Sequence, residues 1–199
     1  MAAYISFQPK DFFSALKYTG TGSSNAVTGV GFSPDAVWIK TTSNGQKPCM
    51  FDTARGVQKV IYPSESTAEI TDASLLTAFG ADGFTVATDN DVNGSAYAFS
   101  SWNWKGGTTT GITTDGSTTI TPSAYSFNAA AGIAILKYTG NTTAGAGLAH
   151  GMGKKPACFI AKDLSTTESW TVYHQAVGNT KFMTLNGAGA ATTASNRWN

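Results

Sequence analysis

Three oxygen-bearing side chains, Asp89, Asp91 and Asn93, alternate within the segment DNDVNG. This spacing matches the first half of the calcium-loop pattern, in which carboxylate and amide oxygens recur at every second position. The pattern requires Glu at its twelfth position, where this chain has Ser100. The same residues are typical of a polar turn that joins two strands of a hairpin. We expect the turn, and keep a Ca²⁺ site as the weaker alternative.

A charged pair, Asp52 and Arg55, follows an apolar stretch in the string FDTARG. A carboxylate and a guanidinium this close either pair with each other or offer charge-assisted hydrogen bonds to a sugar. His174 occupies the position of Asp52 in the second copy of a repeat described below. Side chains that differ within a repeated scaffold indicate either a binding role or an unconstrained surface loop, and both interpretations stay open.

The tryptophans divide into two groups by their surroundings in the sequence. Trp38 and Trp170 lie in apolar, strand-like stretches, so we expect them in the core. Trp102 and Trp104, in the string SSWNWKGG, and Trp198 have polar neighbours. Their rings offer flat apolar faces that stack on sugars or on partner chains. The candidate ligand-binding residues are therefore Asp52, Arg55, Trp102, Trp104 and His174.

The residue types that catalysis requires are scarce in this chain. It has two histidines, His150 and His174, and three glutamates, Glu65, Glu69 and Glu168. All three glutamates lie in polar stretches, and nothing in the sequence places two carboxylates opposite each other, as a glycosidase requires. We therefore expect a non-enzymatic protein without a cofactor.

A repeat underlies these motifs. The string LKYTG occurs at residues 16–20 and again at residues 136–140, which is 120 positions later (136 − 16). Further along, Pro34 aligns with Pro156, and the offset becomes 122 positions (156 − 34). The aligned positions share apolar or aromatic character, Gly or Pro, which are the properties that specify strands and turns. The repeat therefore predicts one structural unit that is present twice.

Three segments follow from the repeat: a first β repeat with its N-terminal lead-in over residues 1–106, a connecting segment over residues 107–131, and a second repeat over residues 132–199. The connecting segment is rich in Gly, Thr and Ser, and its stretches 109–113 and 118–121 predict a β-hairpin. The aromatic strand that ends the first repeat has no counterpart in the second. We therefore expect the second repeat to be truncated, with an open sheet edge that favours pairing with like subunits.

Short apolar segments bounded by Gly, Pro, Asn and Asp predict strands along the whole chain. The segment 96–104 has aromatic residues on both faces, which is typical of a central strand. One helix is predicted over residues 72–79, with Asp72 as its cap. Many strands and almost no helix predict an all-β protein, a β-sandwich or jelly roll built from two related repeats, the second incomplete. The predicted strands cover residues 15–18, 27–30, 36–40, 49–52, 57–62, 84–88, 96–104, 132–138, 147–150, 157–162, 170–173 and 181–185.

Composition argues against several classes of function. Charged residues make up 13% of the chain, against roughly 25% in an average soluble domain. The net charge is +1 and the basic residues are scattered, so we expect no nucleic-acid partner. We expect no membrane insertion and no signal peptide, because no apolar stretch is long enough and the N-terminus lacks a basic segment. Cys49 and Cys158 are expected to be free thiols, with a disulfide between them left open.

Strings distributed along almost the whole chain carry a family signature. The first copy contains FQPKDFF, LKYTGTG, TGVGFSPDAVWIK, FDTARG, TAFGADGFTV and WNWKGG, and the second contains AILKYTG, AHGMGKKPACFIAK and SWTVYH. Together they resemble a family of repeat-containing virion proteins encoded by tailed bacteriophages, many of them marine. The resemblance implies a lectin-like β-sandwich of the tail-fibre or adhesin type, and it brings no catalytic residues with it.

From the residues and this resemblance we expect a non-enzymatic virion protein of the tail-fibre or adhesin type that binds a host surface glycan or receptor. Two alternatives stay open: a capsid-decorating or tail-shell subunit with no ligand of its own, and a polysaccharide depolymerase. The expected partners are like subunits, as in a trimeric fibre, other virion proteins, and the host glycan. The expected location is the virion, assembled in the host cytoplasm.

Overall fold

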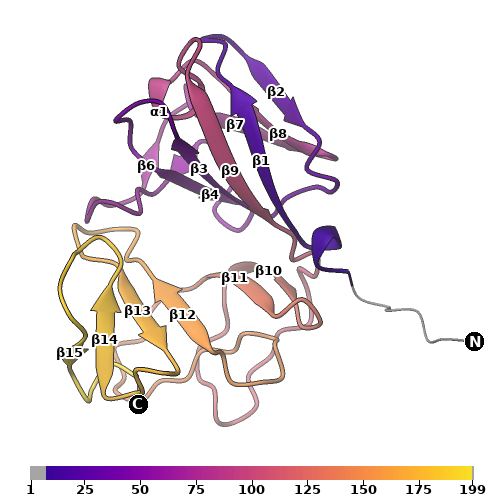
Figure 1. Ribbon diagram of the computed structural model, residues 1–199. Helices are drawn as coiled ribbons and strands as arrows, with labels where there is room; N and C mark the ends of the chain where they lie inside the picture. Colours follow the sequence, from indigo (N-terminus) through magenta and orange to yellow (C-terminus); the bar gives the residue numbers. More distant parts are fainter. Residues whose placement is uncertain (1–7, 199) are drawn as a thin grey trace, which may run out of the picture.

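The protein consists of two β-rich units, drawn in indigo to magenta and in orange to yellow in Figure 1. The computed structural model describes residues 8–198. Within these residues helix is confined to a 3₁₀ turn, η1 (Pro9–Asp11), and one short helix, α1 (Asn90–Asn93). The remaining elements are strands in antiparallel sheets. The predicted all-β fold is therefore confirmed.

The largest sheet of the first unit contains four strands in the order β1-β9-β3-β4. They are β1 (Phe13–Thr19), β9 (Ala98–Trp104), β3 (Ala36–Thr41) and β4 (Cys49–Asp52). β9 pairs with β1 on one side and with β3 on the other. The prediction of a central strand in this aromatic segment is confirmed.

The two faces of β9 differ in burial because successive side chains point to opposite sides of a strand. Phe99, Ser101 and Asn103 are buried on one face. Trp102 and Trp104, on the opposite face, are half-buried. The inner face of this sheet therefore contributes to the core, and its outer face carries large aromatic rings.

A second sheet covers the inner face. It contains β2 (Asn25–Thr28), β8 (Gly83–Val86) and β7 (Leu76–Gly80), in that order. A short pair, β5 (Lys59–Val60) and β6 (Ile70–Thr71), lies beside β4. Side chains of both sheets and the adjoining loops form one apolar core, made of Val27, Val37, Ile39, Cys49, Phe51, Val60, Tyr62, Leu75, Leu76, Phe84, Val86, Val92 and Phe99.

The second unit contains a hairpin and one four-stranded sheet. The hairpin joins β10 (Ala124–Asn128) to β11 (Ile133–Lys137). The sheet has the order β12-β13-β14-β15, with β12 (Cys158–Ala161), β13 (Thr171–His174), β14 (Lys181–Thr184) and β15 (Thr192–Thr193). Among the described residues no second sheet covers this one as β2, β8 and β7 cover the first.

Strand pairings in the two units correspond at an offset of 122 positions. β13 begins and ends 122 positions after β4, and β15 begins and ends 122 positions after β6. The register is also the same, since Val37 faces Phe51 in the first unit and Phe159 faces Tyr173 in the second. The aligned stretches of sequence therefore form the same local arrangement of strands.

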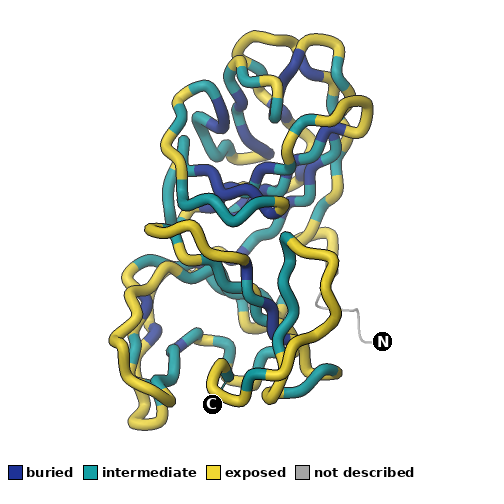
Figure 2. Tube along the Cα trace, turned by 90° about the vertical axis from the view of Figure 1, so that its left-hand side faces the viewer, coloured by how far each residue is buried: buried dark blue, intermediate teal, exposed yellow. Residues whose placement is uncertain are grey.

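Burial is concentrated in the first unit (Figure 2). The units contact each other through Trp170, which is 2% exposed and whose Nε1 donates to the carbonyl oxygens of Tyr62 and Glu65, both at 3.0 Å. The N–H of Glu69 also donates to the carbonyl oxygen of Leu164 at 3.0 Å. One buried indole thus anchors the second unit to the loop that follows β5.

The predicted helix over residues 72–79 is wrong. Asp72 Oδ1 accepts hydrogen bonds from the N–H and the hydroxyl of Ser74, at 2.8 and 2.6 Å, and forms a turn. β7 begins at Leu76 and pairs with β8. Pairing and burial of Leu75 and Leu76 in the core outweigh a weak local preference for helix.

The predicted hairpin around residues 89–94 is also wrong. β8 and β9, the strands on either side, belong to different sheets. α1 lies between them, and the side chain of Asp89 caps it by accepting from the N–H of Asp91. The polar residues therefore carry the chain from one layer to the other instead of reversing it within one sheet.

The connecting segment forms a different hairpin from the predicted one. The stretches 109–113 and 118–121 contain no strand, and Ile120 forms only an isolated bridge with Leu148. The strand predicted over residues 147–150 is absent from the described structure, and Leu148 contributes only the bridge with Ile120. The observed hairpin, β10 with β11, extends across the expected boundary at residue 131, because Tyr125 and Phe127 supply the apolar alternation that the Thr-rich stretches lack.

Candidate functional site

Arg55 lies at the centre of a polar network in the first unit. Its side chain is 4% exposed, and its Nε donates to Asp52 Oδ2 at 2.6 Å. The other nitrogens donate to Glu69 Oε2 at 3.2 Å and to the backbone oxygens of Lys59 and Met50. Four acceptors surround the guanidinium, so Asp52 and Arg55 face each other. Contact with a sugar would require this network to open.

The predicted calcium-loop residues each have a structural partner. Asp89 Oδ1 accepts from the N–H of Asp91 at 2.7 Å, and Asp91 Oδ1 accepts from the N–H of Lys47 at 3.0 Å. Asn93 is fully buried, and its Oδ1 accepts from the N–H of Thr21 at 2.9 Å. Within residues 8–198 no group of three or more His, Cys, Asp or Glu side chains could hold a metal ion.

Charges gather beside α1. Burial raises the pKa of Asp91, and the neighbouring carboxylates of Asp89 and Glu65 add to this effect. Lys47 opposes it, and its Nζ lies 3.0 Å from Glu65 Oε1 and 4.8 Å from the ring centroid of Tyr62. Each charge in this group thus has a partner of opposite sign or a hydrogen bond, which favours a structural role.

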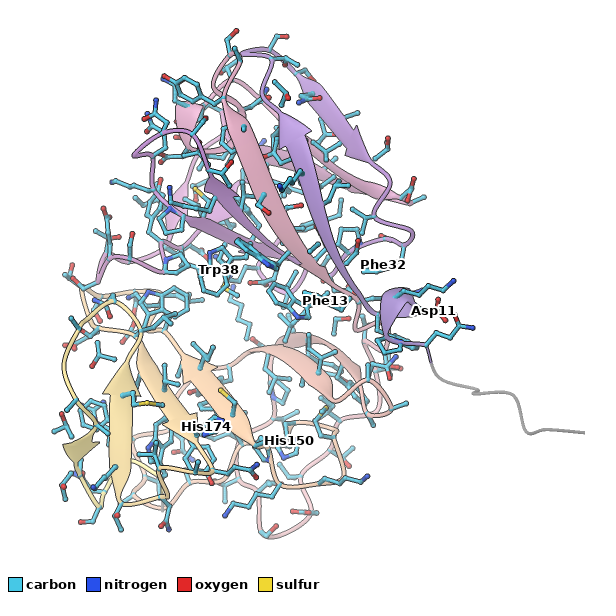
Figure 3. All side chains as sticks on the ribbon, viewed as in Figure 1. Asp11, Phe13, Phe32, Trp38, His150 and His174 are labelled. Atoms are coloured by element: carbon cyan, nitrogen blue, oxygen red, sulfur yellow. The ribbon has the colours of Figure 1, made fainter. Side chains whose placement is uncertain are left out.

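The outer face of the four-stranded sheet carries four aromatic rings. Trp102 packs edge-on against Trp38, with ring centroids 6.3 Å apart, and Trp104 packs against Phe13 at 5.5 Å. Figure 3 shows Phe13 and Trp38 on the side of the first unit that is nearer to the second unit. The rings already pack against one another in pairs, and Trp102 and Trp104 are therefore only partly available to a ligand.

The predictions for Trp38 and Trp170 have opposite outcomes. Trp170 is buried, as expected. Trp38 is half-buried and lies outside the core, because its neighbours Val37 and Ile39 take the inward positions of β3. Strand alternation, and not hydrophobicity alone, decides which side chains of β3 enter the core.

The two histidines serve turns in the second unit (Figure 3). His174 Nδ1 accepts from the N–H of Ala176 at 3.2 Å, and His150 Nδ1 accepts from the N–H of Met152 at 3.1 Å. His174 lies in the second unit, whereas Asp52 and Arg55 lie in the first. The structure therefore does not gather the five candidate ligand-binding residues into one site.

An open hollow of about 210 Å³ lies in the second unit. Its aromatic wall is Trp198, whose Nε1 donates to the carbonyl oxygen of Lys181 at 2.9 Å. The ring meets those of Phe159 and Tyr173 edge-on, with centroids 5.8 and 5.7 Å away. The residues that line the hollow are Lys155, Pro156, Phe159, Tyr173, Asn179 and Trp198.

Two polar side chains flank these rings. Lys155 and Asn179 are exposed, and they supply an ammonium donor and an amide that both donates and accepts. Flat apolar faces combined with a few polar groups suit a ligand such as a sugar ring. Sequence reasoning singled out Trp198 and missed the other residues, because they come from a turn, two strands and a loop that only the fold brings together.

The walls of the hollow have buried counterparts in the first unit. At an offset of 122 positions, Phe159 and Tyr173 correspond to Val37 and Phe51, which are fully buried. In the first unit a second sheet covers these positions. The repeat offset marks these positions as equivalent, and the structure shows that no second sheet covers them in the second unit among the described residues.

The fold and the hollow define a class: an all-β protein with an open aromatic surface in its second unit. Residues 8–199 match the family described as Domain of unknown function (DUF7483), and the protein belongs to this family. No curated protein and no solved structure matches the chain. No helix in residues 8–198 has the length and apolar character needed to cross a membrane.

Proposed function

We propose that the protein is a non-enzymatic attachment protein of the tail-fibre or adhesin type in a bacteriophage virion, and that it binds a host surface glycan. The observation that carries the proposal is the hollow in which Phe159, Tyr173 and Trp198 meet beside Lys155 and Asn179. The sequence resemblance to tail-associated virion proteins supports the biological setting.

The chemistry of the hollow favours a particular kind of sugar. Aromatic rings pack against the apolar face of a pyranose, and Asn179 offers hydrogen bonds to hydroxyl groups. Lys155 adds a positive charge at the rim, which favours a uronic or other acidic sugar over a neutral one. The volume of about 210 Å³ is smaller than the roughly 300 Å³ at the low end of drug-sized pockets, so a single sugar ring is the expected unit of recognition.

Binding to an array of purified bacterial capsule and O-antigen polysaccharides tests this proposal. We expect Trp198→Ala to abolish binding, and Lys155→Ala to weaken binding of acidic polysaccharides at least several-fold. Lys154→Ala is the matched control, because Lys154 is the adjacent lysine and does not line the hollow. Equal binding by the Lys154 and Lys155 variants, or no binding to any polysaccharide, would contradict the proposal.

A second function is favoured by one specific observation. The walls of the hollow correspond to fully buried positions of the first unit, so a neighbouring subunit could cover them. In that case the protein is a capsid-decorating or tail-shell subunit. Electron microscopy of assembled particles labelled with an antibody to the chain distinguishes the two functions, since an adhesin lies at the tail tip and a decorating subunit covers a shell.

A further inference from the structure

In the first unit, β9 lies between β1 and β3 and forms hydrogen bonds with one edge of each. These bonds show which residues of β1 and β3 direct their backbone groups towards β9. The N–H of Gly20 donates to the carbonyl oxygen of Tyr97 at 2.8 Å, and the N–H of Thr42 donates to that of Ala98 at 2.7 Å. In an antiparallel pair, backbone groups of every second residue point to the same neighbour. The even-numbered residues of β1 and β3 therefore direct their backbone groups towards β9.

The corresponding edge of β11 is open among the described residues. Phe127 of β10 exchanges backbone hydrogen bonds with Thr108, at 3.0 and 2.9 Å, so its backbone groups point away from β11. The even-numbered residues of β10 face β11, and by the register they meet odd-numbered residues such as Ile135. Ala134 and Leu136 therefore direct their backbone groups to the other edge, which no described strand occupies.

The edge of β12 that faces away from β13 is also open among the described residues. The N–H of Gln175 donates to the carbonyl oxygen of Ala157 at 2.8 Å, which continues the β12–β13 ladder. Odd-numbered residues of β12 therefore face β13, and Cys158 and Ile160 face the other edge. Among residues 8–198 no strand pairs with that edge. Cys158 is exposed, and Ile160 is 42% exposed.

The first unit shows what fills an edge of this kind. At offsets of 120 and 122 positions, Leu136 corresponds to Leu16 and Ile160 corresponds to Trp38. Leu16 and Trp38 both pair with β9. The open edges of β11 and β12 are thus the counterparts of the two edges that hold β9 in the first unit. Unpaired strand edges are templates for adding another strand.

We propose that the second unit is a strand acceptor, in which the open edge of β12, together with that of β11, takes an extended segment that pairs with these edges as β9 pairs with β3 and β1. The segment has the pattern of β9, with aromatic and small or polar side chains on both faces, and it runs antiparallel to both strands. Main-chain hydrogen bonds supply most of the affinity, and the fit of the side chains on each face fixes the register.

The register of the occupant follows from the first unit. Ala36 is the partner of Trp104 in the β3–β9 pair. Cys158 corresponds to Ala36, so it lies opposite the position of Trp104 in the bound segment. Residue Asn103 of that segment points to the opposite face. Cys158 is a free thiol, which makes this register measurable.

The first experiment measures binding of the synthetic peptide AYAFSSWNWK, residues 96–105, to the full chain by fluorescence anisotropy. We expect saturable binding that Ile160→Pro weakens about tenfold or more, because proline removes an N–H directed at the peptide and adds a clash. Thr193→Pro is the matched control. It removes an N–H from the outer edge of β15, since the N–H of Ala194 donates to Thr180 and Thr193 therefore points away from β14.

The second experiment uses disulfide exchange to report the register. The Trp104→Cys peptide carries its thiol as a mixed disulfide with 2-thiopyridine. The Cys158 thiolate attacks the peptide sulfur, forms the protein–peptide disulfide and releases 2-thiopyridone, whose absorbance gives the rate. We expect this peptide to react at least tenfold faster than the Asn103→Cys peptide. Cys158→Ser identifies the reacting thiol, because Cys49 is buried and its pKa is raised by that burial.

Three outcomes would overturn the proposal: no saturable binding of the peptide, equal loss of binding in the Ile160 and Thr193 variants, or equal exchange rates for the two cysteine peptides. Light scattering of the chain with and without the peptide gives a fourth. If the chain dimerises through this edge and the peptide does not compete, a second copy occupies the edge in another manner, and the proposed occupant is wrong.

Discussion

Val37 of the first unit is fully buried, whereas Phe159, the equivalent residue 122 positions later, is only half-buried. The strand pairings around the two residues have the same register. The difference lies in the second layer, because β2, β8 and β7 cover the first sheet and no described strands cover the other. The same strand pairing thus occurs with and without a covering sheet. Backbone hydrogen bonds hold the strands together in both units, whereas a closed core also requires the second layer.

The largest expected effect comes from the same substitution made in both units. Phe51→Ala should lower the free energy of unfolding by about 3–5 kcal/mol, since it leaves a cavity in a closed core. Phe159→Ala should cost only about 1–2 kcal/mol, because the half-buried ring loses fewer contacts and solvent enters the space that it leaves. Urea denaturation followed by circular dichroism gives both values. Similar costs would show that the second unit has a closed core after all.

The buried Arg55 network has no counterpart in the second unit. Arg55→Met should destabilise the protein by about 3 kcal/mol or more, because the carboxylates of Asp52 and Glu69 lose their partner. Val177→Met is the matched control, since Val177 occupies the position 122 residues later, is half-buried and has no charge to lose. A cost below 1 kcal/mol for Arg55→Met, measured in the same denaturation experiment, would assign the network a role other than stability.

Removal of one N–H group, that of the Trp170 indole, should weaken the contact between the two units. Trp170→Phe keeps an aromatic ring and removes the N–H that donates to the carbonyl oxygens of Tyr62 and Glu65. We expect a loss of about 1–3 kcal/mol, the cost of leaving buried acceptors unpaired. Hydrogen exchange should then become faster in the second unit while the first unit keeps its protection. Uniform acceleration in both units would mean that they unfold as one body.

The smallest expected effect is a difference in pH dependence between two equivalent turns. In the second unit, hydrogen bonds from the N–H and hydroxyl of Ser165 lower the pKa of Asp163 from its ordinary value of 3.8 to about 2. The equivalent residue of the first unit is Thr41, which does not titrate. A carboxyl whose pKa is lower in the folded state stabilises the fold above its unfolded pKa.

This stabilisation is present above about pH 4 and is lost as the pH falls towards 2. Asp163→Asn keeps the acceptor oxygen and removes the charge, so the variant should lose this part of the acid sensitivity. NMR titration of the Ser165 amide in the wild type and the variant measures it. An unchanged titration curve in the variant would assign the effect to another group.

Several elements were predictable because they depend on local pattern. The strand over residues 49–52 was predicted with its observed bounds, and the alternation in residues 96–104 identified a central strand. The helix predicted over residues 72–79 is wrong, because pairing of β7 with β8 stabilises a strand there more than the local sequence favours a helix. Pairing of Arg55 with Asp52 was one of the two interpretations of the sequence, whereas Glu69 could not be predicted as a partner, because it reaches Arg55 only through the loop that β5 and β6 close.

The candidate site was predictable only in part. Trp198 could be singled out as an aromatic residue with polar neighbours, but its contacts with Phe159 and Tyr173 depend on the fold, which brings the C-terminal segment against β12 and β13. The predicted group of Asp52, Arg55, Trp102, Trp104 and His174 is divided between an ion-pair network, the aromatic outer face of a sheet and a turn.

The sequence by itself determined the all-β class and the placement of most long strands, and its internal repeat predicted equivalent positions 122 residues apart. These properties follow from side-chain alternation and turn residues, which act over a few neighbouring positions. The tertiary structure alone decided which sheet is covered, which strand edges are open and where the aromatic hollow lies. Coverage and open edges depend on contacts between residues far apart in the chain, and local pattern carries no information about them.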